Sequence, residues 1–184
     1  MAIKEVIKMG HPTLRKVAEK VDIEALPSQE IDQLVQDLFD TMEKEGGIGI
    51  AAPQINVSLQ VAIVGIPSDN PRYEDLDIEE IDDFEPLVVI NPEIKILDEA
   101  KQGFWEGCLS VPGLRGYVER PKKVEITFYN PEGKQMQIEA EGFMATVFQH
   151  ELDHLFGKLY VDRVSDITKL SYIDEYLEFH EEEE

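Results

Sequence analysis

The stretch from Phe143 to Phe156 is the feature that most limits how this chain can fold. A helix over these residues would carry apolar side chains on most of its sides, which is typical of a buried helix. The same stretch contains His150, Glu151 and His154, and a buried helix must give such polar groups partners. We therefore expect a central helix, ended by Gly157, around which the rest of the chain packs.

The spacing of the two histidines in this helix indicates a metal site. Positions i and i+4 lie on one helix face, so His150 and His154 can offer imidazole nitrogens to one ion. Glu151 lies one position round from His150, where a carboxylate serves as a general base for water rather than as a ligand. A catalytic site of this type needs a third protein ligand and an open position, so two histidines leave it incomplete.

Several residues are candidates for the third ligand. The sequence after His154 lacks the further Gly-x-x-His of the metzincin pattern. A thermolysin-like site would take Glu175 or Glu178, but we expect these acids in an exposed C-terminal helix at 166–180. Cys108 is favoured over them, because a thiolate is a strong ligand and Cys with two His is a known catalytic set. As the only cysteine, Cys108 cannot form an internal disulfide.

The remaining sequence predicts strands and two further helices. An N-cap serine followed by apolar residues at helical spacing predicts an amphipathic helix over 28–44, stopped by Gly46-Gly47. The stretch 104–112 is mixed, and Pro112-Gly113 is interpreted as a turn. Strands are expected at 3–7, 59–66, 87–91 and 94–97, with an antiparallel hairpin of 122–129 and 134–140. The predicted class is α+β, with antiparallel β-sheets packed around a central metal-binding helix, an N-terminal amphipathic helix and a C-terminal helix.

Length and charge set further limits on the function. At 184 residues, and with no repeat or linker, the chain is expected to be a single domain over 1–184. Acids outnumber bases by 39 to 17, and this net charge of -22 argues against broad binding to nucleic acid or anionic membranes. Part of the charge falls in an acidic loop insertion at 68–86 and an acidic tail at 181–184. No run reaches the roughly 18 apolar residues of a membrane span.

The N-terminus has neither an apolar signal core nor transit-peptide character. We therefore expect a cytoplasmic protein, or an organellar one if a transit segment has been removed.

Three short motifs, in this order along the chain, resemble those of the peptide deformylase family. Residues 47–54, Gly-Ile-Gly-Ile-Ala-Ala-Pro-Gln, are similar to its GxGxAAxQ motif, and 106–110 are similar to EGCLS. Residues 149–154, Gln-His-Glu-Leu-Asp-His, are similar to QHExDH. The His-Glu-x-x-His pattern alone occurs in many metalloproteases, but three motifs in order, with the only cysteine in the second, are specific.

The resemblance implies a site and a reaction. It implies Cys108, His150 and His154 as metal ligands, and Glu151, the Gln54 side chain and the Leu109 backbone N–H as catalytic groups. The last two would donate hydrogen bonds to the formyl oxygen of the substrate. The implied reaction removes the formyl group from N-formyl-methionyl peptides of newly made proteins and releases formate. Iron(II) is the implied physiological metal, with Zn²⁺, Ni²⁺ or Co²⁺ possible in the isolated protein.

The resemblance also implies where the substrate lies. The peptide is expected to extend along Ile48-Gly49 and to pair with it backbone to backbone. Candidates for the methionine pocket and the rim of the cleft are Glu106, Phe143, Val147 and Arg115, with ordinary core packing or an unrelated exposed arginine as the alternatives.

The expected partners are nascent formyl-methionyl peptides, with no direct nucleic acid and no membrane. In one branch of the family a basic C-terminal helix is thought to touch the ribosome. Here no Lys or Arg follows Lys169, so the acidic C-terminus does not support such a contact.

Two other functions remain open on the sequence. One is a metalloendopeptidase that uses the same His-Glu-x-x-His chemistry, against which the cysteine ligand argues. The other is a non-catalytic metal-binding domain of the same fold, against which Glu151 argues, because a structural site needs no base.

Overall fold

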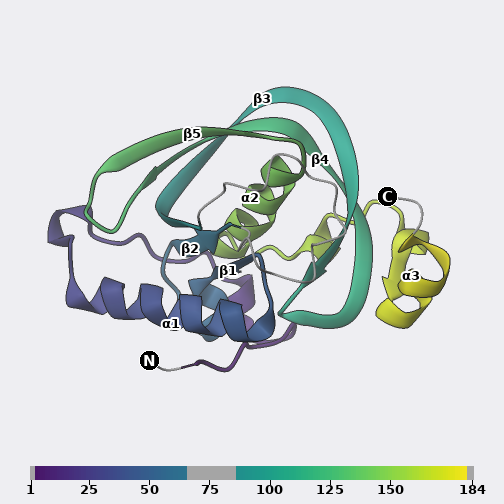
Figure 1. Cartoon of the computed structure of the whole chain (residues 1–184), viewed down its shortest axis with the longest axis horizontal. Helices are drawn as coiled ribbons and strands as arrows, with labels where there is room; N and C mark the ends of the chain where they lie inside the picture. The colour runs from purple at the N-terminus through teal and green to yellow at the C-terminus, as the bar shows by residue number, and fades with distance from the viewer. Residues whose placement is uncertain (1–2, 66–85, 182–184) are drawn as a thin grey trace.

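The computed structural model of the chain describes residues 3–65 and 86–181 (Figure 1). In this part of the chain one six-stranded sheet runs in the order β1-β2-β3-β4-β5, β6 pairs with β4, and all of these pairs are antiparallel. The strands are β1 (Gly49–Ala51), β2 (Val61–Val64), β3 (Leu87–Cys108), β4 (Val111–Tyr129), β5 (Gln135–Glu141) and β6 (Leu170–Tyr172). The α-helices are α1 (Gln29–Glu45), α2 (Gly142–Leu155) and α3 (Ile173–Phe179). The α+β class is confirmed, although the strands form one sheet where several were expected.

Helix α1 begins and ends where the sequence predicts. The Ser28 side chain accepts a hydrogen bond from the backbone N–H of Ile31, and Gly46 ends the helix at φ +65°. The buried stripe of the helix includes Leu38 and Met42 and packs against one side of β1 and β2. This packing fixes β1, which directly follows α1 and carries the first sequence motif.

The region predicted as mixed at 104–112 holds the end of β3, a two-residue turn and the start of β4. Strand β3 runs to Cys108, Cys108 pairs with Val111, and the reversal is a two-residue turn at Leu109-Ser110. The predicted turn at Pro112-Gly113 is wrong, because both residues lie inside β4, with Gly113 at φ +79°. The register of β3 with β4 shifts between the Glu106–Gly116 and Cys108–Val111 pairs, so Pro112 and Gly113 lie in an irregular part of the strand. Pro112 is tolerated there because it falls near the start of the strand.

Helix α2 is enclosed, as its apolar circumference predicts. Its buried side chains, including Phe148 and Leu155, pack against apolar residues of β1, β2, β4 and β5. Figure 1 shows the long strands β3 and β4 curving around this helix. Gly157 follows the end of the helix at φ +71°.

The two ends of the chain differ from the predictions. The stretch 166–180 is not one helix: it holds a 3-10 turn (Ile167–Lys169), then β6, then the short helix α3. The edge of β4 at Leu114–Gly116 offers backbone partners that capture β6 before a helix can form. Residues 3–7 form no strand, and the Ile7 N–H instead bonds to the carbonyl of Gln54.

Two predictions concern segments that are mostly not described. The acidic loop insertion at 68–86 and the acidic tail at 181–184 lie outside the described residues, apart from Pro86 and Glu181. The single-domain boundary at 1–184 stays a prediction. Within the described ranges no helix is both long and apolar enough to span a bilayer.

The packing of α1 gives a test of the fold. Leu38 is fully buried on α1, whereas Leu177 on α3 is 49% exposed. We expect Leu38→Ala to lower the free energy of unfolding by about 2–5 kcal/mol through lost burial and a cavity. Leu177→Ala is the matched control and should change it by about 0.5 kcal/mol or less. Urea denaturation measures both, and equal effects would contradict the assigned core.

Candidate metal centre

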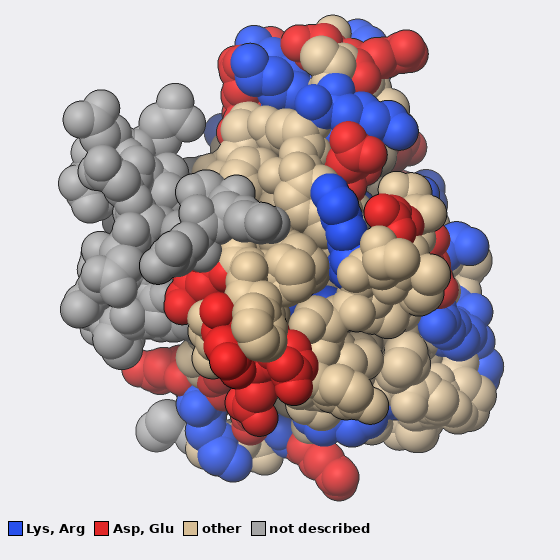
Figure 2. All heavy atoms as spheres, turned by 90° about the vertical axis from the view of Figure 1, so that its right-hand side faces the viewer, with Lys and Arg blue, Asp and Glu red and all other residues tan. Residues whose placement is uncertain are grey.

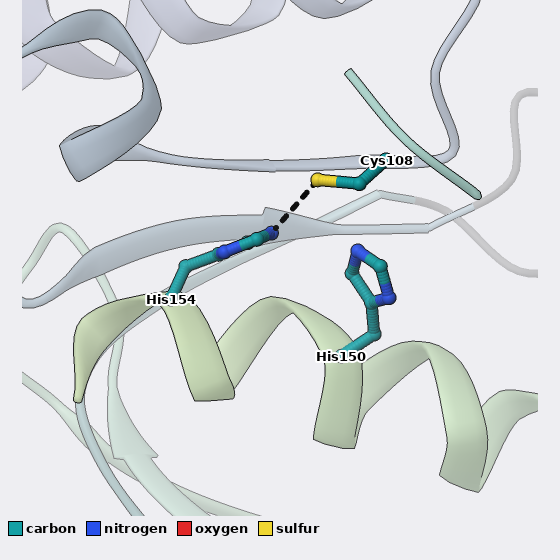
Figure 3. A group of neighbouring side chains, drawn as sticks. All are labelled: Cys108, His150 and His154. Atoms are coloured by element: carbon teal, nitrogen blue, oxygen red, sulfur yellow. Dashed lines mark hydrogen bonds between the residues drawn. The ribbon is translucent and has the colours of Figure 1, made fainter. Parts of the chain in front are cut away.

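Cys108 and the two histidines of α2 converge on one point (Figure 3). One ligand atom from each of Cys108, His150 and His154 lies within 4.8 Å of the others, and the Cys108 Sγ to His154 Nε2 distance is 3.5 Å. Among the described residues this is the only such group, and Glu175 and Glu178 lie exposed on α3. A thiolate and two imidazoles at this spacing fit a divalent first-row metal ion.

The electrostatics of the site favour Cys108 as a thiolate. Burial alone would raise the pKa of the Cys108 thiol. The charge of His154 and hydrogen bonds with His150 and His154 outweigh burial and lower the pKa to about 5. The sulfur is therefore already in the form that binds a metal.

His150 is oriented by a buried acid. Its Nδ1 lies 2.8 Å from Oε2 of Glu106, which leaves Nε2 as the nitrogen that can bind a metal. Arg120 in turn holds Glu106 with two hydrogen bonds, of 2.6 and 3.0 Å, and both side chains are only 5% exposed. Burial would raise the pKa of Glu106, but the hydrogen bonds with His150 and Arg120 lower it. This carboxylate is therefore charged and fixes the imidazole ring.

Arg120 also binds Asp153, the residue before His154 on α2. Its Nη1 donates to Oδ2 of Asp153 at 2.9 Å. The sequence named Glu106 only as a pocket candidate and did not identify Arg120 or Asp153. The sequence did contain a signal for them, namely charged residues within a strand and a helix that are otherwise buried. Such residues must be paired.

Glu151 lies beside Gly49 of the first motif. A Cβ atom on Gly49 would sit 2.6 Å from the Glu151 carboxyl carbon, so only glycine leaves room for this side chain. Within the described chain the buried Oε2 of Glu151 has no hydrogen-bond partner, and burial raises its pKa. A carboxylate that is buried without a partner, and whose pKa is raised, is suited to accept a proton from water.

Gln54 lies close to Cys108 with a fixed orientation. Its Oε1 accepts a hydrogen bond from the Ala51 N–H at 2.8 Å, so Nε2 points the other way. That nitrogen lies 3.2 Å from Oγ of Ser110 and 3.5 Å from Sγ of Cys108. Leu109 directly follows Cys108 in the β3–β4 turn. Both predicted donors therefore lie beside the candidate metal ligands, and their roles stay predictions.

The predicted substrate residues occupy varied positions. Ile48 and Phe143 are partly buried against the core around α2, and Val147 is a buried member of it. Arg115 lies over Gly107, where an added Cβ would clash with its guanidinium group. Their part in binding a methionine side chain stays a prediction.

Comparisons with known proteins find relatives of this chain in both sequence and fold. The family model described as polypeptide deformylase matches residues 3–170. A peptide deformylase of Leptospira biflexa is 41% identical over 172 residues, which cover 94% of this chain and 93% of that protein. A Met-Ala-Ser-bound crystal structure of a class I type b peptide deformylase from Acinetobacter baumannii matches with a TM-score of 0.78 and 36% identity, over 89% of this chain and 99% of that one. A peptide deformylase structure from Thermotoga maritima matches with a TM-score of 0.76 and 32% identity, over 90% and 100%.

The buried ion pair of Arg120 gives a stability test. We expect Arg120→Met to lower the free energy of unfolding by about 3–5 kcal/mol, because it leaves the Glu106 carboxylate buried without its cation. The control is Lys95→Met, which breaks an exposed 3.8 Å pair with Glu125 in the same sheet and should cost about 1 kcal/mol or less. Urea denaturation of the metal-free proteins measures both changes. Similar losses would mean that Arg120 is not a buried partner.

The thiolate of Cys108 gives a pH test. In metal-free folded protein we expect alkylation of Cys108 to have its midpoint at about pH 5. In unfolded protein the midpoint should be at roughly pH 8.5. Folding lowers the pKa of the Cys108 thiol, so the thiolate stabilises the folded protein. This contribution is fully present at a pH above the pKa of the unfolded thiol, and it is lost as the pH falls through about 5. Mass spectrometry of alkylated protein measures the midpoint, and His154→Ala should raise it. A folded midpoint near the unfolded one would contradict the proposed environment.

Proposed function

This chain belongs to the peptide deformylase family, and on that premise we propose how its own residues carry out the reaction. The enzyme hydrolyses the formamide bond of N-formyl-methionyl peptides and releases formate. Water adds its oxygen to the formyl carbon, the carbon–nitrogen bond breaks, and the peptide leaves with a free amine. The main support for the proposal is that one residue from each of the three motifs lies at the same place. Sγ of Cys108 is 3.5 Å from Nε2 of Gln54 and 3.5 Å from Nε2 of His154.

Cys108, His150 and His154 would hold the metal. A divalent ion in such a site lowers the pKa of water and polarises a carbonyl oxygen. Three protein ligands leave a position open, as a catalytic site requires. We propose Fe²⁺ as the physiological ion, with Zn²⁺, Ni²⁺ or Co²⁺ able to replace it, since a Cys/His₂ set suits several first-row metals.

Glu151 is proposed to move the proton. It would take a proton from the attacking water and pass it to the nitrogen of the departing amine. Its raised pKa and the space left by Gly49 support this role. Glu151 therefore ends the reaction with the same number of protons as it had at the start.

Gln54 and the Leu109 N–H are proposed to stabilise the oxyanion that develops on the formyl oxygen. The fixed amide of Gln54 needs no reorganisation as charge develops, which is how such donors lower a barrier. The Gln54 backbone is held by the Ile7 N–H, and that of Ser110 by the Met9 N–H. The N-terminal segment therefore ties together the two parts of the chain that carry the donors.

The peptide is proposed to bind along Ile48-Gly49. Strand β1 ends the sheet order, so within the described chain only its β2 side is paired. An open strand edge can receive an extended peptide through backbone hydrogen bonds. The Acinetobacter baumannii relative with bound Met-Ala-Ser supports a peptide ligand. Phe143, Val147 and Glu106 remain the candidates for the methionine pocket, with Arg115 at its rim.

The surface favours a peptide partner over nucleic acid. Figure 2 shows acidic side chains gathered over α3, where Asp174, Glu175 and Glu178 are exposed. Such a face repels the phosphate backbone of RNA, so we propose no direct ribosomal RNA contact through it. Because formyl-methionyl chains are the substrate, we place the enzyme where they are synthesised, in the cytoplasm.

Formate release tests the function. We expect the anaerobically metal-loaded enzyme to release formate from a formyl-Met-Ala-Ser peptide and to leave internal bonds of an acetylated peptide intact. Glu151→Gln should bind metal normally and lose activity by about 10²–10⁴-fold, because the proton carrier is gone. Glu178→Gln, an exposed change on α3, is the matched control and should retain full activity.

Each alternative function has its own outcome in this experiment. Internal cleavage without formate release would identify a metalloendopeptidase. Metal binding without either reaction would identify a non-catalytic domain. Full activity of Glu151→Gln would remove Glu151 from the mechanism while leaving the reaction in place.

A further inference from the structure

Arg163 forms hydrogen bonds with Asp153, which is the outermost of a series of charged side chains that leads inward to a proposed metal ligand. It directly follows the 3-10 turn η5 (Tyr160–Asp162), a few residues beyond the end of α2. Its Nη2 donates to Oδ1 of Asp153 at 2.7 Å, and its Nε donates to Oδ2 at 3.1 Å. From Asp153 the series continues through Arg120 and Glu106 to the imidazole of His150. The reaction described above assigns no role to Arg163.

The carboxylate of Asp153 is held from both sides. Oδ2 also accepts from Nη1 of Arg120, at 2.9 Å. In the described part of the chain, Oδ1 is bonded by Arg163 alone. The Asp153 side chain is 13% exposed and that of Arg163 is 48% exposed, so a surface residue holds a nearly buried acid. Without Arg163 the carboxylate can rotate about its own bond, and Arg120 loses a fixed partner.

We propose that Arg163 is a positioning residue for His150. By holding the plane of the Asp153 carboxylate, it keeps Arg120 bound to Glu106 and thereby keeps the imidazole in the orientation that binds metal. The proposal rests on the proposed function, because it takes His150 to be a metal ligand. It predicts that a change on the surface loosens metal binding inside the protein.

The chain supplies a matched control in the same turn. Arg15 forms an ion pair with Asp162, and the Arg15 side chain is 42% exposed, close to the value for Arg163. Apart from Arg15, the side chain of Asp162 accepts the Leu159 N–H. Asp162 acts on the neighbouring Arg163 only through its charge, and among the described residues no hydrogen bond joins Arg15 or Asp162 to the side chains that lead to His150. Breaking the Arg15–Asp162 pair therefore measures how much the loss of an ordinary exposed arginine pair changes the rate of metal release.

The experiment follows the loss of Co²⁺ from the full chain to an excess of chelator. A thiolate-to-cobalt absorption band reports metal held by Cys108. We expect Arg163→Met to release Co²⁺ about 3- to 10-fold faster than the parent, below the 10–100-fold typical of groups that contact a ligand directly. Arg163→Lys should restore part of the difference, since lysine keeps the charge but not the two-point grip. Arg15→Met should release metal at the parent rate.

A double-mutant cycle tests whether the effect passes through Glu106. In a Glu106→Gln background the connection to His150 is already weakened, so Arg163→Met should add little further acceleration. The same acceleration in both backgrounds, or equal rates for Arg163→Met and Arg15→Met, would overturn the proposal. If the parent binds Co²⁺ without the thiolate band, Cys108 is not a ligand, and the proposed metal site fails together with this inference. If the band is present but the Arg163 variants release Co²⁺ at the same rate as Arg15→Met, the metal site stands and only the positioning role of Arg163 fails.

Discussion

The burial of charge inside a wrapped sheet is the constraint on which the rest of this structure depends. Helix α2 carries Glu151 and His154, and the curved sheet adds Glu106 and Arg120; all four residues are buried. Ionised groups are stable in such a place only when each one is paired, shares a proton or binds a metal. Glu106 and Arg120 meet this requirement through their ion pair, and the proposed metal and proton-transfer roles would supply it for His154 and Glu151, which each have a buried side-chain atom without a hydrogen-bond partner in the described chain.

The sheet and the helix divide this task between them. Strand β3 ends at Cys108, and its immediate reversal into β4 places Leu109 in the turn directly after the thiolate. Helix α2 presents His150 and His154 toward Cys108 (Figure 3). Gly49 of β1 leaves the space that Glu151, also on α2, fills. Rigid elements thereby hold groups that are far apart in sequence, which is the preorganisation that hydrolysis of an amide requires.

Local patterns predicted well what depends on a few adjacent residues. The Ser28 cap, the stripe of α1 and the span of α2 follow from helical periodicity, and the structure confirms them. The turn at Pro112-Gly113 was wrong, because the chain already reverses at Leu109-Ser110 and both residues lie inside β4. A single helix over 166–180 was wrong, because β4 pairs with Leu170–Tyr172 and holds them as β6. The ion pairs of Arg120 and Arg163 with Asp153 were missed, since nothing in a linear pattern states which of many acids faces which arginine.

The sequence by itself determined the family. Its one cysteine, its His-Glu-x-x-His helix and its Gly-x-Gly-x-Ala-Ala-x-Gln loop lie in three ordered motifs that resemble those of peptide deformylases, and this resemblance implies the ligands and the reaction. Only the tertiary structure decided how those groups are held: which acid orients His150, which glycine makes room for Glu151, and which surface arginine closes the chain behind them. The physical reason is that a site's donors and ligands depend on residue identity, whereas their orientation depends on contacts between segments that only the folded sheet brings together.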